Sequence, residues 1–389
     1  MLEYEGKFGK AKIMLDDLGQ DGSNLIKQIY EFLNHEAFTN DISIMPDTHP
    51  GKGAVIGFTM KLTNKVIPNV IGVDIGCGML SFNLTQITFD PKEFDEQIRE
   101  RIPFSTNVHK NKREITSEFY IHTTKAIFNF TKKFNKEFKT SYLPVKINIE
   151  WLKNKCSQIN MDYDRTINSL GTLGGGNHFI EIGIDDKDDI WGTIHSGSRQ
   201  FGLKIANYHQ RKAGKGQLAF LEGEEMFDYL TDMVVAQTYA HFNRTIMLNE
   251  ITSIFNYKPE ITIESVHNYI DFNDLIIRKG AISSYENEKM IIPFNMEDGI
   301  LICEGKSNPN WNYSAPHGAG RVGSRRWAKE NLNLDEAKKN MNEKGIYTSK
   351  LPLDECKQAY KDPKIIEKAI EPTAKIITRL KPVLSCKGD

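Results

Sequence analysis

The stretch GTLGGGNHFIEIGIDDKDDIWGTIHSGSR, residues 171–199, indicates how the rest of the chain is arranged. Its first six residues include four glycines, so the backbone can take positive φ and a ligand can approach it to contact distance. Residues 179–184 and 190–195 then show the pattern of strands. His178 and His195 therefore lie at strand ends beside glycine loops, where metal and phosphate sites are commonly built. The alternative for this stretch is a glycine-rich hairpin with two histidines in the core.

The composition is that of a soluble globular protein. The chain has 389 residues, of which 39% are apolar and 26% charged. Lys and Arg number 50 against 51 for Asp and Glu, so binding to nucleic acid would need a local basic cleft rather than a basic surface. The beginning of the chain, MLEYEGKFGK, lacks the apolar segment of a signal peptide, and no run of about 18 apolar residues occurs. We therefore expect a cytoplasmic protein without a membrane partner.

The five cysteines do not form a recognisable framework. They are scattered along the chain without CxxC spacing, at Cys77, Cys156, Cys303, Cys356 and Cys386. This pattern argues against disulfides and against a zinc finger. A cysteine with a function in this protein would be a free thiol or a metal ligand.

Two further loops carry polar side chains. Residues 42–53, ISIMPDTHPGKG, pass from a strand into a loop with Asp47, His49 and Lys52, which is either a functional loop or an ordinary turn. The nearly continuous apolar runs at 54–60 and 66–73 predict strands buried on both faces. The second run leads to Asp74 and Cys77, whose carboxylate and thiolate can converge on one cation.

The remaining pattern alternates between helical and strand-like segments. Residues 90–170 are charged and amphipathic and predict a peripheral helical insertion, in which His109 and His122 are ordinary surface or groove residues. Helices are expected at 113–134, from 200, over 224–251 with His241 as a packing residue, and from 326. Strands are expected at 261–267, 275–282, 290–293 and 299–303. The apolar tail at 383–389 should dock onto the protein.

The elements that combine glycine and histidine recur near residues 50, 75, 178, 195, 267 and 317. No repeat or flexible linker divides the chain. The simplest arrangement is a single α/β (α+β) domain over residues 1–389 whose strands converge on one site with helices at the periphery.

The candidate ligands suggest phosphoryl chemistry. The candidate ligands are Asp74, Cys77, His178, His195 and His267. These five exceed the needs of one tetrahedral ion, and a bridging thiolate suits a pair of divalent ions. Paired metals neutralise the attacking and leaving oxygens of an in-line displacement. His317 differs, because Arg321, Arg325 and Arg326 follow it closely. An imidazole near guanidinium groups is better suited to attack a phosphorus than to bind a cation.

These residues lie in motifs that resemble those of the RtcB-type RNA-splicing ligases. The motifs are MPDTHPGKG, GVDIGCGM, GTLGGGNHFIE, HSGSR, HNY, RKGA, SAPHGAGRVGSR and CKG, and they occur in the family's order from about residue 40 onward. The resemblance implies a fold peculiar to that family, two manganese ions and GTP. It also implies joining of an RNA 3′-phosphate or 2′,3′-cyclic phosphate to a 5′-hydroxyl through a histidine–GMP intermediate, in RNA repair or tRNA splicing. An archease-like activator is a further partner that the family suggests.

The resemblance assigns roles to positions in this chain. Asp74, Cys77 and His178 would hold one manganese ion, and Cys77, His195 and His267 the second. His317 would be the guanylylated nucleophile, with Glu181 accepting from guanine N1–H and N2–H and Lys387 donating to O6. The guanylate-contacting positions are Asn177, His178, Phe179, Ile180, Glu181, His267, Asn268, Pro293, Phe294, Asn295, Met296, His317, Gly318, Ala319, Gly320 and Lys387. Arg199, Arg321 and Arg325 would hold RNA or nucleotide phosphates, and Asp47 would assist the later steps.

One loop departs from the family pattern. Where the family has PGSMG, this chain has Pro-Phe-Asn-Met-Glu-Asp-Gly at 293–299. We expect Asn295 to contact the guanylate and Glu297 and Asp298 to face away, because their charge would repel a triphosphate. The departure and a length shorter than that of many members indicate a divergent branch devoted to a particular RNA. The alternatives are a metal-dependent phosphoesterase on the same scaffold and a non-catalytic protein that binds RNA ends.

Overall fold

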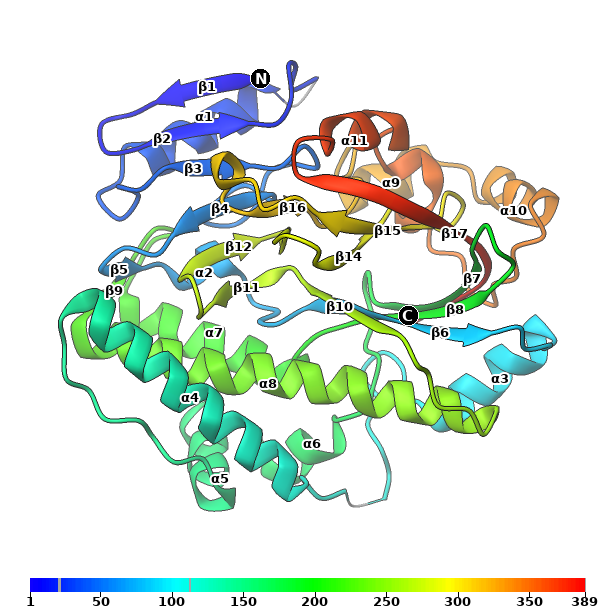
Figure 1. Cartoon of the computed structure of the whole chain (residues 1–389), viewed down its shortest axis with the longest axis horizontal. Helices are drawn as coiled ribbons and strands as arrows, with labels where there is room; N and C mark the ends of the chain where they lie inside the picture. The colour runs from blue at the N-terminus through cyan, green and yellow to red at the C-terminus, as the bar shows by residue number, and fades with distance from the viewer. Residues whose placement is uncertain (20–21, 112, 389) are drawn as a thin grey trace.

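A seven-stranded antiparallel sheet carries most of the candidate site residues. In the computed structural model, which describes residues 1–19, 22–111 and 113–388, its strand order is β10-β6-β8-β7-β17-β15-β14 (Figure 1). The strands are β10 (Thr262–Val266), β6 (Gly78–Thr85), β8 (Ile190–Ser196), β7 (Phe179–Ile184), β17 (Ala374–Lys387), β15 (Ile300–Gly305) and β14 (Lys289–Pro293). Their antiparallel pairing brings residues from distant parts of the chain side by side.

A six-stranded sheet contains the N-terminal strands. Its order is β1-β2-β3-β4-β12-β11, and β2 and β3 are its one parallel pair within the described residues. The strands are β1 (Leu2–Glu5), β2 (Lys10–Ile13), β3 (Ile42–Ile44), β4 (Phe58–Lys61), β12 (Ile276–Lys279) and β11 (Asn268–Asp271). Two short pairs complete the strands: β5 (Lys65–Val66) with β9 (Leu221–Glu222), and β13 (Ala281–Ser283) with β16 (Ser314–Pro316).

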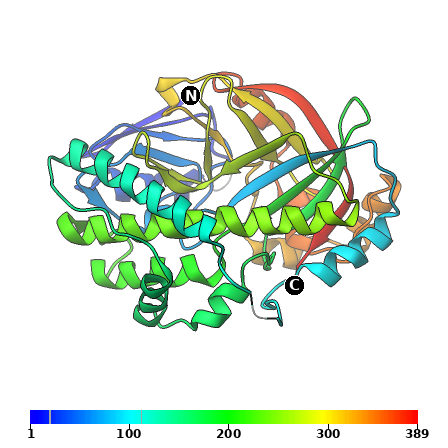
Figure 2. The same ribbon diagram turned by 60° about the horizontal axis from the view of Figure 1, so that its bottom comes forward.

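Helix α8 (Gly223–Ile254) joins the two halves of the molecule, running beneath both sheets (Figures 1 and 2). Its first half packs into the core of the six-stranded sheet, while Met247 and Ile251 pack into the core of the seven-stranded sheet. The other helices are α1 (Gly22–Leu33), α2 (Pro68–Ile71), α3 (Pro91–Arg101), α4 (Ser117–Phe138), α5 (Ile149–Gln158), α6 (Tyr163–Asn168), α7 (Arg199–Ala213), α9 (Arg325–Asn331), α10 (Leu334–Glu343) and α11 (Pro363–Ala369). Short 3-10 turns are η1 (Pro309–Trp311), η2 (Leu353–Glu355) and η3 (Lys357–Ala359).

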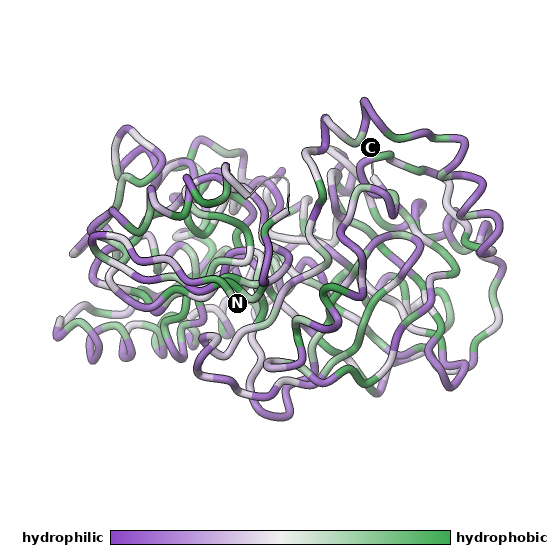
Figure 3. The backbone as a smooth tube through the Cα atoms, turned by 90° about the horizontal axis from the view of Figure 1, so that it is seen from above, coloured by the Kyte–Doolittle hydropathy of each residue, from purple (hydrophilic) through white to green (hydrophobic). Residues whose placement is uncertain are grey.

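The apolar residues are distributed as this arrangement requires. Figure 3 shows apolar stretches running through the interior of both halves and hydrophilic stretches along the outer edges. Helices and sheets are thus mixed within one domain, and the predicted α/β class is confirmed. None of the helices in the described part of the chain is both long and apolar enough to span a membrane.

The segment expected to be a helical insertion contains α3, α4, α5 and α6. Its longest helix, α4, packs against α8, and its buried residues Phe119, Phe130 and Phe134 belong to the same core as the six-stranded sheet. The Phe130 ring stacks on Phe227 of α8 with 5.5 Å between ring centroids. These helices therefore share the main core, and their status as an insertion stays a prediction.

Two of the predicted strands are wrong in part. The run at 66–73 is a strand only at its start, because Pro68–Ile71 forms the helical turn α2. Proline lacks the N–H that a strand ladder needs but fits the first turn of a helix, and the run is buried in either conformation. The run at 54–60 forms a strand only from Phe58, directly after Gly57 with φ 84°.

The run predicted as one strand at 275–282 is divided at Gly280, which has φ 63°. The Gly280 N–H donates to the His267 carbonyl at 2.7 Å, and a β-carbon at this position would lie 3.2 Å from Cε1 of His317. Glycine therefore permits both the bend and the close approach of His317. The tail docks as strand β17 through Lys387, and Asp389 lies outside the described residues.

Candidate metal and nucleotide site

The register of the seven-stranded sheet aligns the candidate residues. Phe179 of β7 pairs with His195 of β8 on one side and with Lys387 of β17 on the other. His195 in turn pairs with Met79 of β6, and Cys77 lies just before that strand. Because paired residues in antiparallel strands point to the same face, one row across the sheet gathers residues from four motifs of the sequence.

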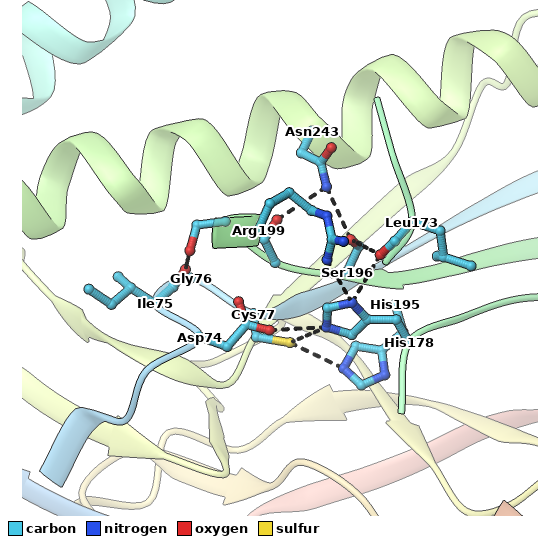
Figure 4. A network of polar contacts seen from close by, with 12 residues as sticks. Asp74, Ile75, Gly76, Cys77, Leu173, His178, His195, Ser196, Arg199 and Asn243 are labelled. Atoms are coloured by element: carbon cyan, nitrogen blue, oxygen red, sulfur yellow. Dashed lines mark hydrogen bonds and ion pairs between the residues drawn. The ribbon is translucent and has the colours of Figure 1, made fainter. Parts of the chain in front are cut away.

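Asp74, Cys77, His178 and His195 converge within hydrogen-bonding distance (Figure 4). The Cys77 sulfur lies 3.5 Å from Nε2 of His178 and 3.3 Å from Nε2 of His195. An Asp74 oxygen lies 3.0 Å from Nε2 of His178. His267 extends the group, since its Nε2 lies 3.3 Å from Nε2 of His195. All five residues that the sequence assigns to the metals are therefore neighbours.

The hydrogen-bonding pattern of His178 fits a cation ligand. Its Nδ1 lies 2.9 Å from the Leu173 carbonyl, which can only accept, so the Nδ1 proton is donated there. In the neutral ring, Nε2 then presents a lone pair to the Asp74 carboxylate and the Cys77 sulfur. Three electron-pair donors at such short distances are stabilised by a shared cation.

Burial sets the protonation of the other ligands. It lowers the pKa of His195 and of His267 well below the usual value, and neighbouring histidines lower it further. Both rings are therefore neutral, which is the form that binds metal ions. Burial and the Asp74 charge raise the pKa of the Cys77 thiol, so metal binding there would displace a proton.

Helix α8 fixes the backbone that carries these ligands. Arg244 is fully buried and donates from one nitrogen to the Gly76 carbonyl at 2.8 Å and the Ser196 carbonyl at 2.7 Å. Its Nε donates to Glu264 at 2.8 Å. Asn243 accepts from the Gly171 amide at 2.8 Å and donates to the Ser196 hydroxyl at 3.0 Å. One turn of α8 thus holds the Cys77 loop, the end of β8 and the glycine-rich loop.

Replacing Arg244 with Lys should weaken metal binding about tenfold to a hundredfold. Lysine keeps the positive charge near Glu264 but cannot reproduce the planar guanidinium, which bonds Glu264 through Nε and both carbonyls through a second nitrogen. Manganese titration followed by calorimetry measures the affinity. Arg113→Lys is a matched control, because Arg113 pairs with Glu250 at 2.9 Å away from the ligands. Equal affinities in the two variants would show that Arg244 does not position the ligands.

A cavity of about 1000 Å³ opens beside the metal ligands. Most of the predicted site residues line it, namely Asp74, Cys77, Asn177, Phe179, Glu181, His195, His267, Asn268, Pro293, Phe294, Asn295, Met296, His317, Gly318, Ala319, Gly320, Arg321, Arg325 and Lys387. His178 and Arg199 instead line a second cavity of about 290 Å³, which meets the first at Asp74 and Asn177. The side chain of Ile180 is in the core, and Asp47 is buried behind the wall.

His317 is fixed by Asp47. An Asp47 oxygen lies 2.6 Å from Nδ1 of His317 and accepts from the His317 backbone N–H at 3.2 Å. Asp47 is fully buried, whereas the His317 side chain is 23% exposed. Gly320 allows this contact, because a β-carbon there would lie 2.3 Å from the Asp47 carbonyl oxygen. The family resemblance places Asp47 in the later steps, and nothing in the sequence indicates that Asp47 orients His317.

Lys387 lies at the opposite end of the row from Met79, and Glu181 follows Phe179 by two residues on β7. Burial raises the pKa of Glu181 to about 8, and the Lys387 charge partly offsets this effect. One Glu181 oxygen is buried without a hydrogen-bond partner. Lys387 donates to Glu355 at 3.0 Å and lies 4.7 Å from the centre of the Phe179 ring. Glu355, Tyr360 and Trp327 also line the cavity, and no sequence motif distinguished them.

The predicted phosphate-binding arginines line two different cavities. Arg199 donates to Thr172 at 3.2 Å and to the Ser105 carbonyl at 3.2 Å, and it lines the second cavity. Arg321 pairs with Glu355 and lies 4.9 Å from the Tyr360 ring centre. Arg325 is more exposed, with Nε 3.8 Å from Asp354.

The loop that departs from the family pattern turns its acids away from the cavity. Glu297 pairs with Lys344 at 3.0 Å and Asp298 with Lys357 at 2.9 Å, and neither acid lines the cavity. Asn295 does line it, but its amide nitrogen donates to Asp298 at 2.8 Å and its oxygen accepts two backbone N–H groups. Contact between Asn295 and a guanylate stays a prediction.

Comparison with known proteins agrees with this geometry. Residues 28–388 match the family described as tRNA-splicing ligase RtcB. RNA-splicing ligase RtcB of Escherichia coli (strain K12) is 31% identical over 386 aligned positions, which cover 89% of this chain and 90% of the relative. tRNA-splicing ligase RtcB of Nanoarchaeum equitans (strain Kin4-M) is 26% identical, with 89% and 87% covered. The chain therefore belongs to the RtcB family of RNA-splicing ligases.

Proposed function

We propose that this protein is a GTP- and manganese-dependent ligase that joins an RNA 3′-phosphate or 2′,3′-cyclic phosphate to a 5′-hydroxyl through a histidine–GMP intermediate. The observation that carries the proposal is the Asp47–His317 pair at 2.6 Å on the wall of a cavity that also contains the metal ligands. A binding protein needs no oriented imidazole there. A phosphoesterase would use the metals but not His317.

His317 acts as the nucleophile. Because its Nδ1 proton is donated to Asp47, the lone pair of the neutral ring is on Nε2. Nε2 attacks the α-phosphorus of GTP, an N–P bond forms, the bond to the bridging oxygen breaks, and pyrophosphate leaves. Asp47 stabilises the positive charge that the ring acquires during the attack.

The ligand groups would hold two manganese ions. Asp74, Cys77 and His178 suit one ion, and Cys77, His195 and His267 suit the second, with the thiolate shared. When bound, such ions neutralise charge on the phosphate oxygens of an in-line displacement. Arg321 and Arg325 lie on the same cavity and bind phosphate oxygens there, while Arg199 binds them from the second cavity.

Later steps transfer GMP from His317 to the RNA 3′-phosphate. The oxygen of that phosphate attacks the phosphorus of the adduct, and the bond to His317 breaks. The 5′-hydroxyl of the second RNA then attacks the activated 3′-phosphate, loses its proton, and displaces GMP. A cyclic phosphate must first be opened by water to the 3′-phosphate.

Glu181 and Lys387 would select guanine. Guanine presents two donors, N1–H and N2–H, and ionised Glu181 has two acceptor oxygens for them. Lys387 can donate to O6, where adenine has an amino group instead. The pair would therefore favour GTP over ATP.

The affinity for GTP should rise with pH up to about 8. Because burial raises the Glu181 pKa to about 8, the carboxyl is protonated at lower pH and must release a proton before it accepts both guanine donors. The affinity should change about tenfold per pH unit below 8 and then level off. Nucleotide titrations from pH 6 to 9 measure it. Glu181→Gln is the control and should bind weakly without this slope; a parallel slope in the variant would assign the titration to another group.

Incubation with manganese and radiolabelled GTP is the direct test of the proposal. The expected result is a covalent GMP adduct that is stable to denaturation and is discharged by RNA with a 3′-phosphate. Release of phosphate from RNA ends without any adduct would support the phosphoesterase. Binding of RNA ends without either reaction would support the non-catalytic protein.

A further inference from the structure

Glu355 is a buried carboxylate among the cations of the nucleotide cavity. It is 4% exposed and lines the cavity. One of its oxygens is 3.0 Å from Nζ of Lys387 and accepts from the Tyr360 hydroxyl at 2.9 Å, while the other pairs with Arg321. Lys387 and Arg321 hold the pKa of Glu355 below its usual value although burial acts in the other direction. Glu355 is therefore ionised and shared by two cations.

Two carboxylates, those of Glu355 and Glu181, are neighbours of Lys387. Glu181 is opposite Ser385 in the β7–β17 pairing, so Lys387 is its diagonal neighbour on the same face of the sheet. Lys387 pairs with Glu355 rather than with Glu181, and an oxygen of Glu181 stays buried without a partner. If Lys387 paired with Glu181, each group would take up the hydrogen-bonding capacity of the other, and neither would be available to bind guanine.

We infer that Glu355 is a positioning residue that holds Lys387 apart from Glu181 and thereby allows the two to read opposite edges of guanine. The inference rests on the proposed function, because it assigns a role within guanylate binding. An ammonium group has three donors, and Glu355 accepts one of them. The remaining donors of Lys387 are available to guanine O6, and the Glu181 carboxyl is available to N1–H and N2–H.

The neutral variant Glu355→Gln distinguishes a role in positioning Lys387 from a role in stabilising the fold. A glutamine offers one acceptor oxygen where Lys387, Arg321 and Tyr360 now share two, so Lys387 is free to pair with Glu181. We expect binding of GTP to weaken about tenfold. We also expect the preference for GTP over 6-thio-GTP, whose sulfur is a poor acceptor at that position, to fall toward unity. A residue that only supported the fold would lower the melting temperature and leave this preference intact.

A matched control and a double variant complete the design. Glu367→Gln removes another carboxylate that pairs with an arginine, Arg379, outside the cavity, and should leave the preference unchanged. In a Lys387→Met background, Glu355→Gln should have no further effect on the preference, because Glu355 acts through Lys387. If Glu355→Gln does not fold, Glu355→Asp replaces it in the same comparison. Its carboxylate is one methylene shorter and should withdraw from Lys387, so the preference should fall there too.

The experiment titrates the wild type and these variants with GTP and 6-thio-GTP in the presence of manganese and records melting temperatures. We expect Glu355→Gln to lose the preference for GTP over 6-thio-GTP. We expect the same substitution to leave that preference unchanged in the Lys387→Met background. An unchanged preference in a folded Glu355 variant, or equal effects in both backgrounds, overturns the inference. Absence of GTP binding and of a GMP adduct in the wild type would instead refute the proposed function.

Discussion

The variant His317→Ala should form no GMP adduct and should not ligate RNA that carries an ordinary 3′-phosphate, yet it should retain both manganese ions. The reason is that His317 is held by Asp47 rather than by the metal ligands, with 4.9 Å between its ring centroid and that of His267. RNA that already carries a 3′-guanylate bypasses the adduct, so the variant should still join it to a 5′-hydroxyl. The assay compares ligation of both RNAs and measures bound metal.

His122→Ala is a suitable control, because His122 is on α4 and stacks on His241 rather than facing the cavity. It should behave as the wild type on both RNAs. If His317→Ala retained metal but sealed neither RNA, His317 would have a role beyond guanylate transfer. If it sealed the ordinary 3′-phosphate with GTP, another residue would be the nucleophile.

The variant Cys77→Ala should lose both manganese ions together. The Cys77 sulfur lies between His178 and His195, at 3.5 and 3.3 Å, and among the described residues it is the one soft donor in contact with both. A shared thiolate supplies a bond to each ion, so its removal weakens two sites with one substitution. Metal analysis of the dialysed variant should find less than a tenth of the manganese of the wild type, a loss of at least about 1.4 kcal/mol in binding at each site.

Cys156→Ala provides the comparison. Cys156 is also a buried free thiol, but it is on α5 near Thr166. The Cys156→Ala variant should keep its full metal content and lose only the stability that a small core cavity costs. Cys77→Ala with full metal content would exclude a bridging thiolate, and loss of a single equivalent would restrict Cys77 to one ion.

Predictions from the sequence succeed where the relevant information is local. The strand pattern at 179–184 and 190–195 marks β7 and β8, and the glycines beside Asp74, His178 and His317 mark loops that carry residues of the site. They fail at 66–73, where an apolar run is buried both as strand and as helical turn. Hydrophobicity predicts burial at these positions but does not distinguish a strand from a helical turn. The single proline that decides between the two contributes little to the hydrophobic pattern.

The sequence by itself therefore determined the α/β class, the family and the candidate metal ligands, because each depends on short motifs or on regular periodicity. The tertiary structure alone decided which side chains support them. Asp47 and His317 are 270 residues apart, Arg244 and Gly76 are 168 apart, and Glu355 reaches Lys387 across 32 residues. Single contacts of this kind leave no periodic trace, because one buried carboxylate or guanidinium resembles any other until folding brings its partner within 3 Å.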